Sequence, residues 1–392
     1  MDYGKKFYGS RTWCDSYSVE WLFGSKFAGK MESSQIDRKG AVVLRFLDKC
    51  LLRAGVTVAL ASLLLSYGAT TQAAAGDGQK RTAAQRPASQ ALPAAQDTTH
   101  MGAWQDFWQK LLNGHAVPDD YTKTVKIGGL IEQAYLFDGP HRIDRQSMAA
   151  PKPMEQYEIY YPADLAETAA RYPAVIVVNG SGTPAKRYPA LFQHLASWGF
   201  IVIGNEDPST GTGQSADRTA SKLLELNEAP DSQFYHRIDI AHIGITGHSQ
   251  GGAGVFNATI TSQPHHALYR TAVALSPTNE RVAEALHWTY DPKAVAIPIF
   301  LLAGAQGDFE LKIVLPKEDM QSMYAKIPAP KAMARRKGAE HGQMLYTADG
   351  YVPAWFCWHL QGDSTAAKVF SGNSPELLQN RCYQDVKLDG FD

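Results

Sequence analysis

Residues 242–252 have the sequence His-Ile-Gly-Ile-Thr-Gly-His-Ser-Gln-Gly-Gly. Residues 242–246 are a short, largely apolar run that predicts a strand, and the residues after Gly251 are compatible with a helix. Between them, residues 247–251 match the pattern G-x-S-x-G. In that pattern the serine sits on a tight strand-to-helix turn, with its hydroxyl exposed at the end of a sheet beside a helix N-terminus. We therefore predict that Ser249 is a nucleophile.

Strands and helices alternate on both sides of this stretch. The run Ala174–Val178 is apolar throughout, as in a strand buried on both faces of a sheet. Further strands are predicted at Tyr157–Tyr161, Phe200–Ile203, Ala272–Leu275 and Ile297–Ala303. Helices are predicted before Trp198, around Ser221–Asn227, after Gly251, near Asp319–Lys326 and at Val352–Leu360. This alternation predicts an α/β fold with a mostly parallel sheet and helices on both faces, and the serine motif specifies an α/β-hydrolase fold.

A serine hydroxyl needs a histidine base, and the histidine needs an acid that fixes its tautomer. In this fold the chain order is serine, acid, histidine. Asp308 follows the strand Ile297–Ala303 and is the predicted acid, with Glu310 as the alternative. His341 lies on the loop before the last predicted helix and is the predicted base. His359 is in an aromatic helix, where a packed role is simpler.

The reaction also needs N–H donors for an oxyanion. One is expected from the residue after the nucleophile, which is Gln250. The other is expected from the loop after an early strand, here residues 179–182, where Ser181 is the candidate donor. An ordinary glycine-rich turn is the alternative reading of that loop.

Several stretches in order resemble the bacterial cutinase-like polyester hydrolases, which grade into dienelactone hydrolases and platelet-activating-factor acetylhydrolases. The similarity extends from about Tyr157 to Asp363. It is carried by Val177–Gly182, Leu195–Ile203, Arg237–Asp239, Gly247–Gly252, Gly304–Asp308 and Ala354–Phe356. The resemblance implies the same assignment of Ser249, Asp308, His341, Ser181 and Gln250.

Two positions depart from the polyester hydrolase pattern. Those enzymes usually have an aromatic residue where this chain has Ser181, and a tryptophan near the position of Ser276. In those enzymes the aromatics form the cleft that holds aromatic polyesters, so their absence argues against an enzyme that degrades plastics or cutin, but not against hydrolase chemistry. Trp288 and Tyr290 could replace them, or could belong to an ordinary surface helix.

The N-terminal part has the features of a targeting segment. Four basic residues (Lys39, Arg45, Lys49 and Arg53) precede the uncharged apolar stretch Ala54–Tyr67, and Ala73 and Ala75 form an A-x-A cleavage signal. We predict a cleaved signal and a secreted or periplasmic protein, with a membrane anchor through residues 54–75 as the alternative. Met31 would be a better start for such a signal than Met1.

This reading divides the chain into an extension and signal (1–75), a linker with a short amphipathic helix (76–120) and a catalytic domain (121–392). The apolar face of that helix is formed by Trp104, Phe107, Trp108, Leu111 and Leu112. Packing on the domain is its simpler role, and contact with a lipid surface is the alternative. Cleavage would remove Cys14 and Cys50 and leave Cys357 and Cys382, which we predict to form a disulfide, with two free thiols as the alternative.

The overall composition leaves function to local chemistry. The 392 residues have a formal net charge of −1, so nothing indicates binding to nucleic acid. No Cys/His spacing suggests zinc, and the proposed chemistry needs no metal or organic cofactor. The sequence thus predicts a serine ester hydrolase acting on a small-molecule, lipid or polymeric ester. A lipase or phospholipase, an acyl transferase and a non-catalytic binding protein are the alternatives, and the oligomeric state is not predicted.

Overall fold

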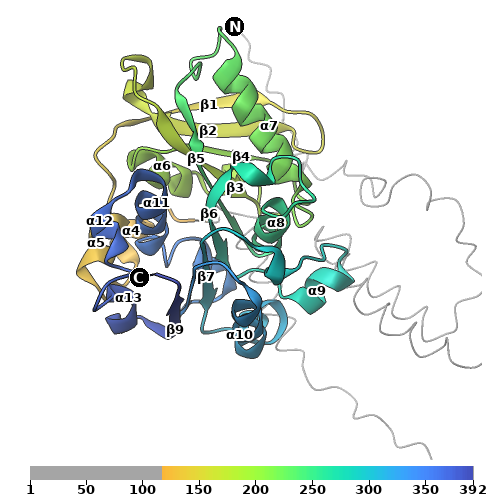
Figure 1. Ribbon diagram of the computed structural model, residues 1–392, viewed down its shortest axis with the longest axis vertical. Helices are drawn as coiled ribbons and strands as arrows, with labels where there is room; N and C mark the ends of the chain where they lie inside the picture. The colour runs from red at the N-terminus through yellow and green to blue at the C-terminus, as the bar shows by residue number, and fades with distance from the viewer. Residues whose placement is uncertain (1–116, 392) are drawn as a thin grey trace, which may run out of the picture. The chain divides into compact units, whose positions relative to one another are not determined.

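The computed structural model of the protein describes residues 117–391 (Figure 1). The predicted signal segment, the linker and the amphipathic face at residues 104–112 lie outside the described residues. Among residues 117–391, no helix has the length and apolar character needed to cross a bilayer.

Nine strands within these residues form one sheet in the order β1-β2-β4-β3-β5-β6-β7-β8-β9. Strands β3 to β8 are paired in parallel, whereas β1, β2 and β9 join the two edges in antiparallel orientation. The strands are β1 (Ile143–Ala149), β2 (Gln156–Pro162), β3 (Tyr172–Val178), β4 (Ile201–Asn205), β5 (Ile238–His248), β6 (Tyr269–Leu275), β7 (Ile299–Gly304), β8 (Lys331–Arg336) and β9 (Tyr383–Asp389). The predicted α/β fold with a mostly parallel sheet is confirmed.

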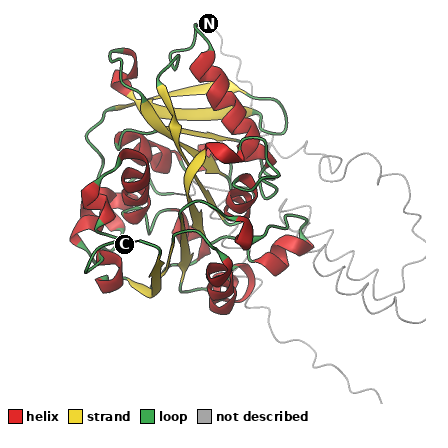
Figure 2. Cartoon of the chain, viewed as in Figure 1, coloured by secondary structure: helices red, strands yellow, loops and turns green. Residues whose placement is uncertain are grey.

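Helices cover both faces of the sheet, as Figure 2 shows. The α-helices are α4 (Tyr121–Thr124), α5 (Leu130–Leu136), α6 (Pro189–Ser197), α7 (Gln214–Glu228), α8 (Gln250–Ala258), α9 (Glu280–Ala285), α10 (Lys317–Lys326), α11 (Tyr351–Gln361), α12 (Ser364–Ala367) and α13 (Glu376–Gln379). A π-helix, η6, spans Phe309–Val314, and a 3₁₀-helix, η7, spans His341–Leu345.

Successive side chains of β3 point to opposite faces of the sheet and so belong to two different parts of the core. All seven residues of this strand are buried. Ile176 and its even-numbered neighbours face a core shared with α7, α8 and α10, whereas Val175 and Val177 face a second core shared with α6 and α11. A strand buried on both faces must be apolar at every position, which is why this run is recognisable in the sequence.

The edge strands β1 and β9 were not predicted. Their sequences, IDRQSMA and YQDVKLD, are rich in polar and charged residues, and most of their positions are partly or fully exposed. Antiparallel pairing with β2 and β8, rather than an apolar pattern of their own, makes them strands.

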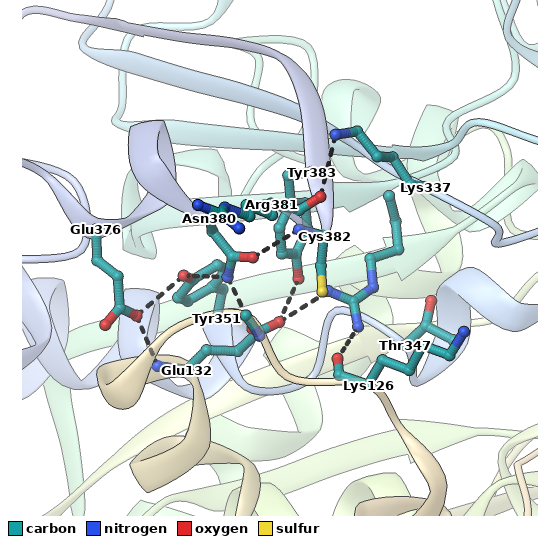
Figure 3. A network of polar contacts seen from close by, with 12 residues as sticks. Lys126, Glu132, Lys337, Thr347, Tyr351, Glu376, Asn380, Arg381, Cys382 and Tyr383 are labelled. Carbon is teal, nitrogen blue, oxygen red and sulfur yellow. Dashed lines mark hydrogen bonds and ion pairs between the residues drawn. The ribbon is translucent and has the colours of Figure 1, made fainter.

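Polar contacts attach the segment before β1 to the C-terminal part of the domain. Glu132 on α5 is 1% exposed, and its carboxylate accepts hydrogen bonds from Arg336, Asn380 and Tyr383. Figure 3 shows this network, in which Asn380 also donates to Tyr351 on α11. The network joins segments far apart in sequence around one buried carboxylate.

The predicted disulfide is wrong for this structure, which has Cys357 and Cys382 as free thiols. Cys357 is buried within α11 in the second core, and burial raises the pKa of its thiol. Cys382 belongs to the network in Figure 3, where its N–H donates to Asn380 and its carbonyl accepts from Lys337. The chain after α11 is therefore held by hydrogen bonds and core packing rather than by a covalent bridge.

Candidate active site

The candidate residues all follow the carboxyl ends of parallel strands. Residues 179–182 follow β3, Ser249 follows β5, Ser276 follows β6, Glu310 comes shortly after β7, and His341 comes shortly after β8. Because parallel strands end at the same edge of a sheet, groups far apart in the sequence converge there.

Ser249 has the strained backbone expected of the strand-to-helix turn. Its φ is 59° and its ψ is −118°, a left-handed φ that is uncommon for a residue with a side chain. The glycines around it are required by close approach. A Cβ on Gly247 would collide with the carbonyl of Gly251, and one on Gly252 would lie 2.6 Å from Cα of Pro277. The small residues of the motif therefore allow the close approach of strand and helix that the sequence predicted.

His341 begins the 3₁₀-helix η7 and is 4% exposed. Glu340 and Gln343 form a capping box that fixes the start of η7. The imidazole of His341 lies against that of His248, the residue before the nucleophile, with ring centroids 4.5 Å apart. The structure therefore brings the predicted base next to the serine turn. His359, by contrast, is packed among the rings of Trp355 and Trp358, in agreement with the packed role expected for it.

The structure changes the assignment of the acid. Oε2 of Glu310 is 2.6 Å from Nδ1 of His341, so the alternative candidate occupies the position of the acid. Asp308 forms an ion pair with Lys312, and its side chain is 44% exposed. Glu310 is buried at the start of the π-helix that begins at Phe309, whereas Asp308 and Lys312 are exposed. We therefore replace Asp308 with Glu310 as the candidate acid.

The carboxylate of Glu310 is held at both oxygens. It is fully buried, and its Oε1 accepts hydrogen bonds from the hydroxyl of Ser276 at 2.6 Å and from the N–H of Gly304 at 2.9 Å. Its Oε2 faces His341. A buried carboxylate with all of these partners is stable only because each oxygen is satisfied. The sequence indicated only that a tryptophan is absent near position 276. The structure shows that the hydroxyl of Ser276 contacts the candidate acid.

The candidate oxyanion loop after β3 is fixed by buried polar groups. The side chain of Asn179 donates to the carbonyl oxygens of Asn205 and Asp207. The backbone carbonyl of Asn179 accepts a hydrogen bond from the hydroxyl of Thr210 at 2.6 Å. A tight turn follows, in which the N–H of Thr183 donates to the carbonyl of Gly180. This turn places Ser181 beside the end of β3 that neighbours β5.

Gln250 is the first residue of α8. The first N–H groups of a helix have no acceptor within the helix, so its N–H is available to an anion near Ser249. A Cβ on Gly180 would lie 3.6 Å from Cβ of Ser249, so the loop with Ser181 lies close to the turn that leads into Gln250.

Tyr290 and Trp288, the two residues considered as replacements for the aromatics of the cleft, lie in different surroundings. Tyr290 is buried, stacks on Phe256 and donates its hydroxyl to the carbonyl of Thr278, so it belongs to the core. Trp288 is partly buried against the core, and its ring lies over Gly211, where a Cβ would collide with it. The carbonyl of Trp288 accepts from Asn257. Trp288 therefore packs against the loop around residue 211.

Within residues 117–391, no group of three or more His, Cys, Asp or Glu side chains is arranged to hold a metal ion.

Comparison with known proteins shows the family of the chain. A family model described as PET hydrolase-like matches residues 127–358, more than half of the chain, and the chain belongs to this family. A cutinase (est2) of Thermobifida alba is 27% identical over 192 residues, covering 47% of this chain and 56% of the relative. A bis(hydroxyethyl) terephthalate hydrolase of Streptomyces coelicolor is 30% identical over 153 residues, covering 38% and 44% respectively. The alignments span about half the length of these relatives. The resemblance to polyester hydrolases is confirmed.

Proposed function

We propose that this protein is an exported ester hydrolase that works through an acyl-enzyme. The observation that carries the proposal is the buried contact between His341 and Glu310, placed against the strained turn that bears Ser249. Membership of the PET hydrolase-like family supports the same chemistry.

The contact with Glu310 sets the tautomer of His341. Nδ1 carries the hydrogen that it donates to the carboxylate, which leaves the lone pair on Nε2 to act as the base. In the proposed reaction, the oxygen of Ser249 attacks the ester carbonyl and Nε2 of His341 takes its proton. The buried charge of Glu310 stabilises the imidazolium that forms.

The remaining steps use the backbone donors. The N–H groups of Ser181 and Gln250 stabilise the negative oxygen of the tetrahedral intermediate. His341 then gives its proton to the leaving alcohol, and the acyl group stays on Ser249. A water molecule, activated by His341, attacks the acyl-enzyme and releases the acid.

The names of the relatives, cutinase and bis(hydroxyethyl) terephthalate hydrolase, support a polymeric or oligomeric ester as the substrate. The hydroxyl of Ser276 is engaged with Glu310, and Tyr290 is in the core, so these positions do not supply an aromatic surface for a terephthalate ring. We therefore expect aliphatic esters to be cleaved faster than aromatic ones.

Steady-state hydrolysis tests the proposal. The purified protein is assayed with p-nitrophenyl esters of graded chain length and with bis(hydroxyethyl) terephthalate, beside Ser249→Ala. Turnover that Ser249→Ala abolishes supports the proposal. A preference for long chains at a lipid–water interface would favour a lipase, and no turnover of any ester would favour a non-catalytic binding protein.

A further inference from the structure

His248 touches three parts of the candidate site. It is the last residue of β5, directly before Ser249, and is 5% exposed. Its Nε2 lies 2.8 Å from the carbonyl oxygen of His341. On its other side, a Cβ on Gly180 would lie 3.3 Å from its Nδ1. One imidazole thus lies between the loop of the base and the loop of the oxyanion donor.

The hydrogen bond to a carbonyl fixes the protonation of this ring. A carbonyl oxygen only accepts, so Nε2 of His248 carries the hydrogen and donates it. Burial and the nearby charge of His341 lower the pKa of His248 well below its usual value, although the bond to the carbonyl opposes this. A neutral His248 adds no positive charge beside His341 when His341 takes a proton. The carboxylate of Glu310 lies on the Nδ1 side of His341.

The imidazole of His341 has contacts on several sides. The ring of Phe309 meets it in an edge-to-face arrangement with centroids 4.8 Å apart. The ring of His248 lies at 4.5 Å and is tilted by 37°. Nδ1 is bound to Glu310, and the proposed reaction assigns Nε2 to the proton of Ser249. A side chain held in this way has little freedom to turn away from Ser249.

We propose that His248 is a positioning residue for the base: its Nε2–H holds the backbone of His341, and its ring supports the imidazole. This inference rests on the proposed function, because it assigns a role in proton transfer between Ser249 and His341. Rigid placement of the base matters since small displacements of a catalytic group cost large factors in rate.

Two substitutions separate the hydrogen bond from the ring. His248→Phe keeps an aromatic ring and removes the donor, whereas His248→Gln keeps an amide N–H close to the position of Nε2. We expect His248→Phe to lower kcat about tenfold with KM changed less than about twofold, because one hydrogen bond to the backbone of the base is lost. We expect His248→Gln to recover most of this loss.

The controls distinguish positioning from general stability. His242→Phe makes the same change at an exposed position of β5, where the ring contacts Asp239, and should leave kcat unchanged. Melting temperatures are measured for all variants. Should His248→Phe not fold, the comparison of His248→Gln with His248→Asn carries the test, because the shorter amide of asparagine does not reach the carbonyl.

The outcomes separate the two proposals. Labelling of Ser249 by a fluorophosphonate in the wild-type protein must come first, and its absence would count against the proposed function itself. If the wild type is labelled, lower kcat in His248→Phe with recovery in His248→Gln supports the positioning role. Equal kcat in all variants, or an equal loss in Phe and Gln variants that melt like the wild type, would overturn it.

Discussion

Two carboxylates of this protein, Glu310 and Glu132, are buried to nearly the same degree but have different partners. Glu310 is 0% exposed and faces His341, Ser276 and the N–H of Gly304. Glu132 is 1% exposed and faces Arg336, Tyr383 and Asn380. Both satisfy the rule that a buried charge must be paired.

The difference between the partners separates a reactive site from a structural one. A guanidinium does not release its proton in proteins, so Arg336 keeps its charge and its pairing with Glu132 is a permanent structural contact. In the proposed reaction the imidazole of His341 takes a proton from Ser249, and the buried carboxylate of Glu310 stabilises the imidazolium that forms. Burial alone therefore does not identify a catalytic carboxylate, whereas the partner does.

The largest expected effect comes from neutralising Glu310. Glu310→Gln should lower kcat about 10³-fold or more, because the amide no longer stabilises the imidazolium and can favour the wrong tautomer. Asp308→Asn should change kcat by less than about threefold, because its side chain is 44% exposed and Glu310 is the carboxylate bound to Nδ1 of His341. Steady-state kinetics on one good ester measures both. The reverse ranking would restore Asp308 as the acid.

A change in the Glu132 network should lower the stability of the protein and leave kcat unchanged. Glu132→Gln leaves Arg336 buried without its counter-charge and should lower the free energy of unfolding by about 3–5 kcal/mol. At a temperature where the variant is folded, its kcat should match the wild type. Urea unfolding followed by circular dichroism measures the first quantity. A loss of kcat in fully folded protein would mean that the two carboxylates are not separate in function.

A smaller effect is expected at Ser276. Ser276→Ala removes one of the two donors to Oε1 of Glu310 and should lower kcat about tenfold, the value of roughly one hydrogen bond to a charged group. Introducing the same change into Glu310→Gln should have almost no further effect if Ser276 acts through Glu310. Additive losses in the double variant would assign Ser276 a separate role.

A separate prediction concerns stability and pH at a histidine outside the site. Burial lowers the pKa of His359 to about 4, below the value of 6.5 for an exposed histidine. Between these values the unfolded chain binds the proton and the folded chain does not, so stability falls as pH decreases from about 6.5 to about 4. The full loss is about 3 kcal/mol. Chemical unfolding at several pH values should show a shallower slope in His359→Phe than in the wild type, and equal slopes would contradict the assignment.

Part of this account is predictable from the sequence. The central strands are readable because burial on both faces makes runs such as residues 174–178 apolar. Ser249 and its glycines are readable because steric limits at the turn leave few residue types. His341 can be predicted as the candidate base from its place in the chain order.

The candidate acid cannot be predicted from the sequence, because the choice between Asp308 and Glu310 depends on the path of the chain after β7. Asp308 and Glu310 are two residues apart, and in the turn that leads into the π-helix it is Glu310 that faces the histidine. Nothing in a strand-and-helix pattern reports that path. The role of Ser276 depends on Glu310 and is hidden for the same reason.

The most direct test of the central claim is to react the protein with a fluorophosphonate and locate the label by peptide mass, because the reagent requires an activated serine. The account predicts labelling at Ser249 in the wild type and in Asp308→Asn, much slower labelling in Glu310→Gln, and none in Ser249→Ala. Absence of labelling in folded wild-type protein, or labelling of Glu310→Gln at the wild-type rate, would contradict it.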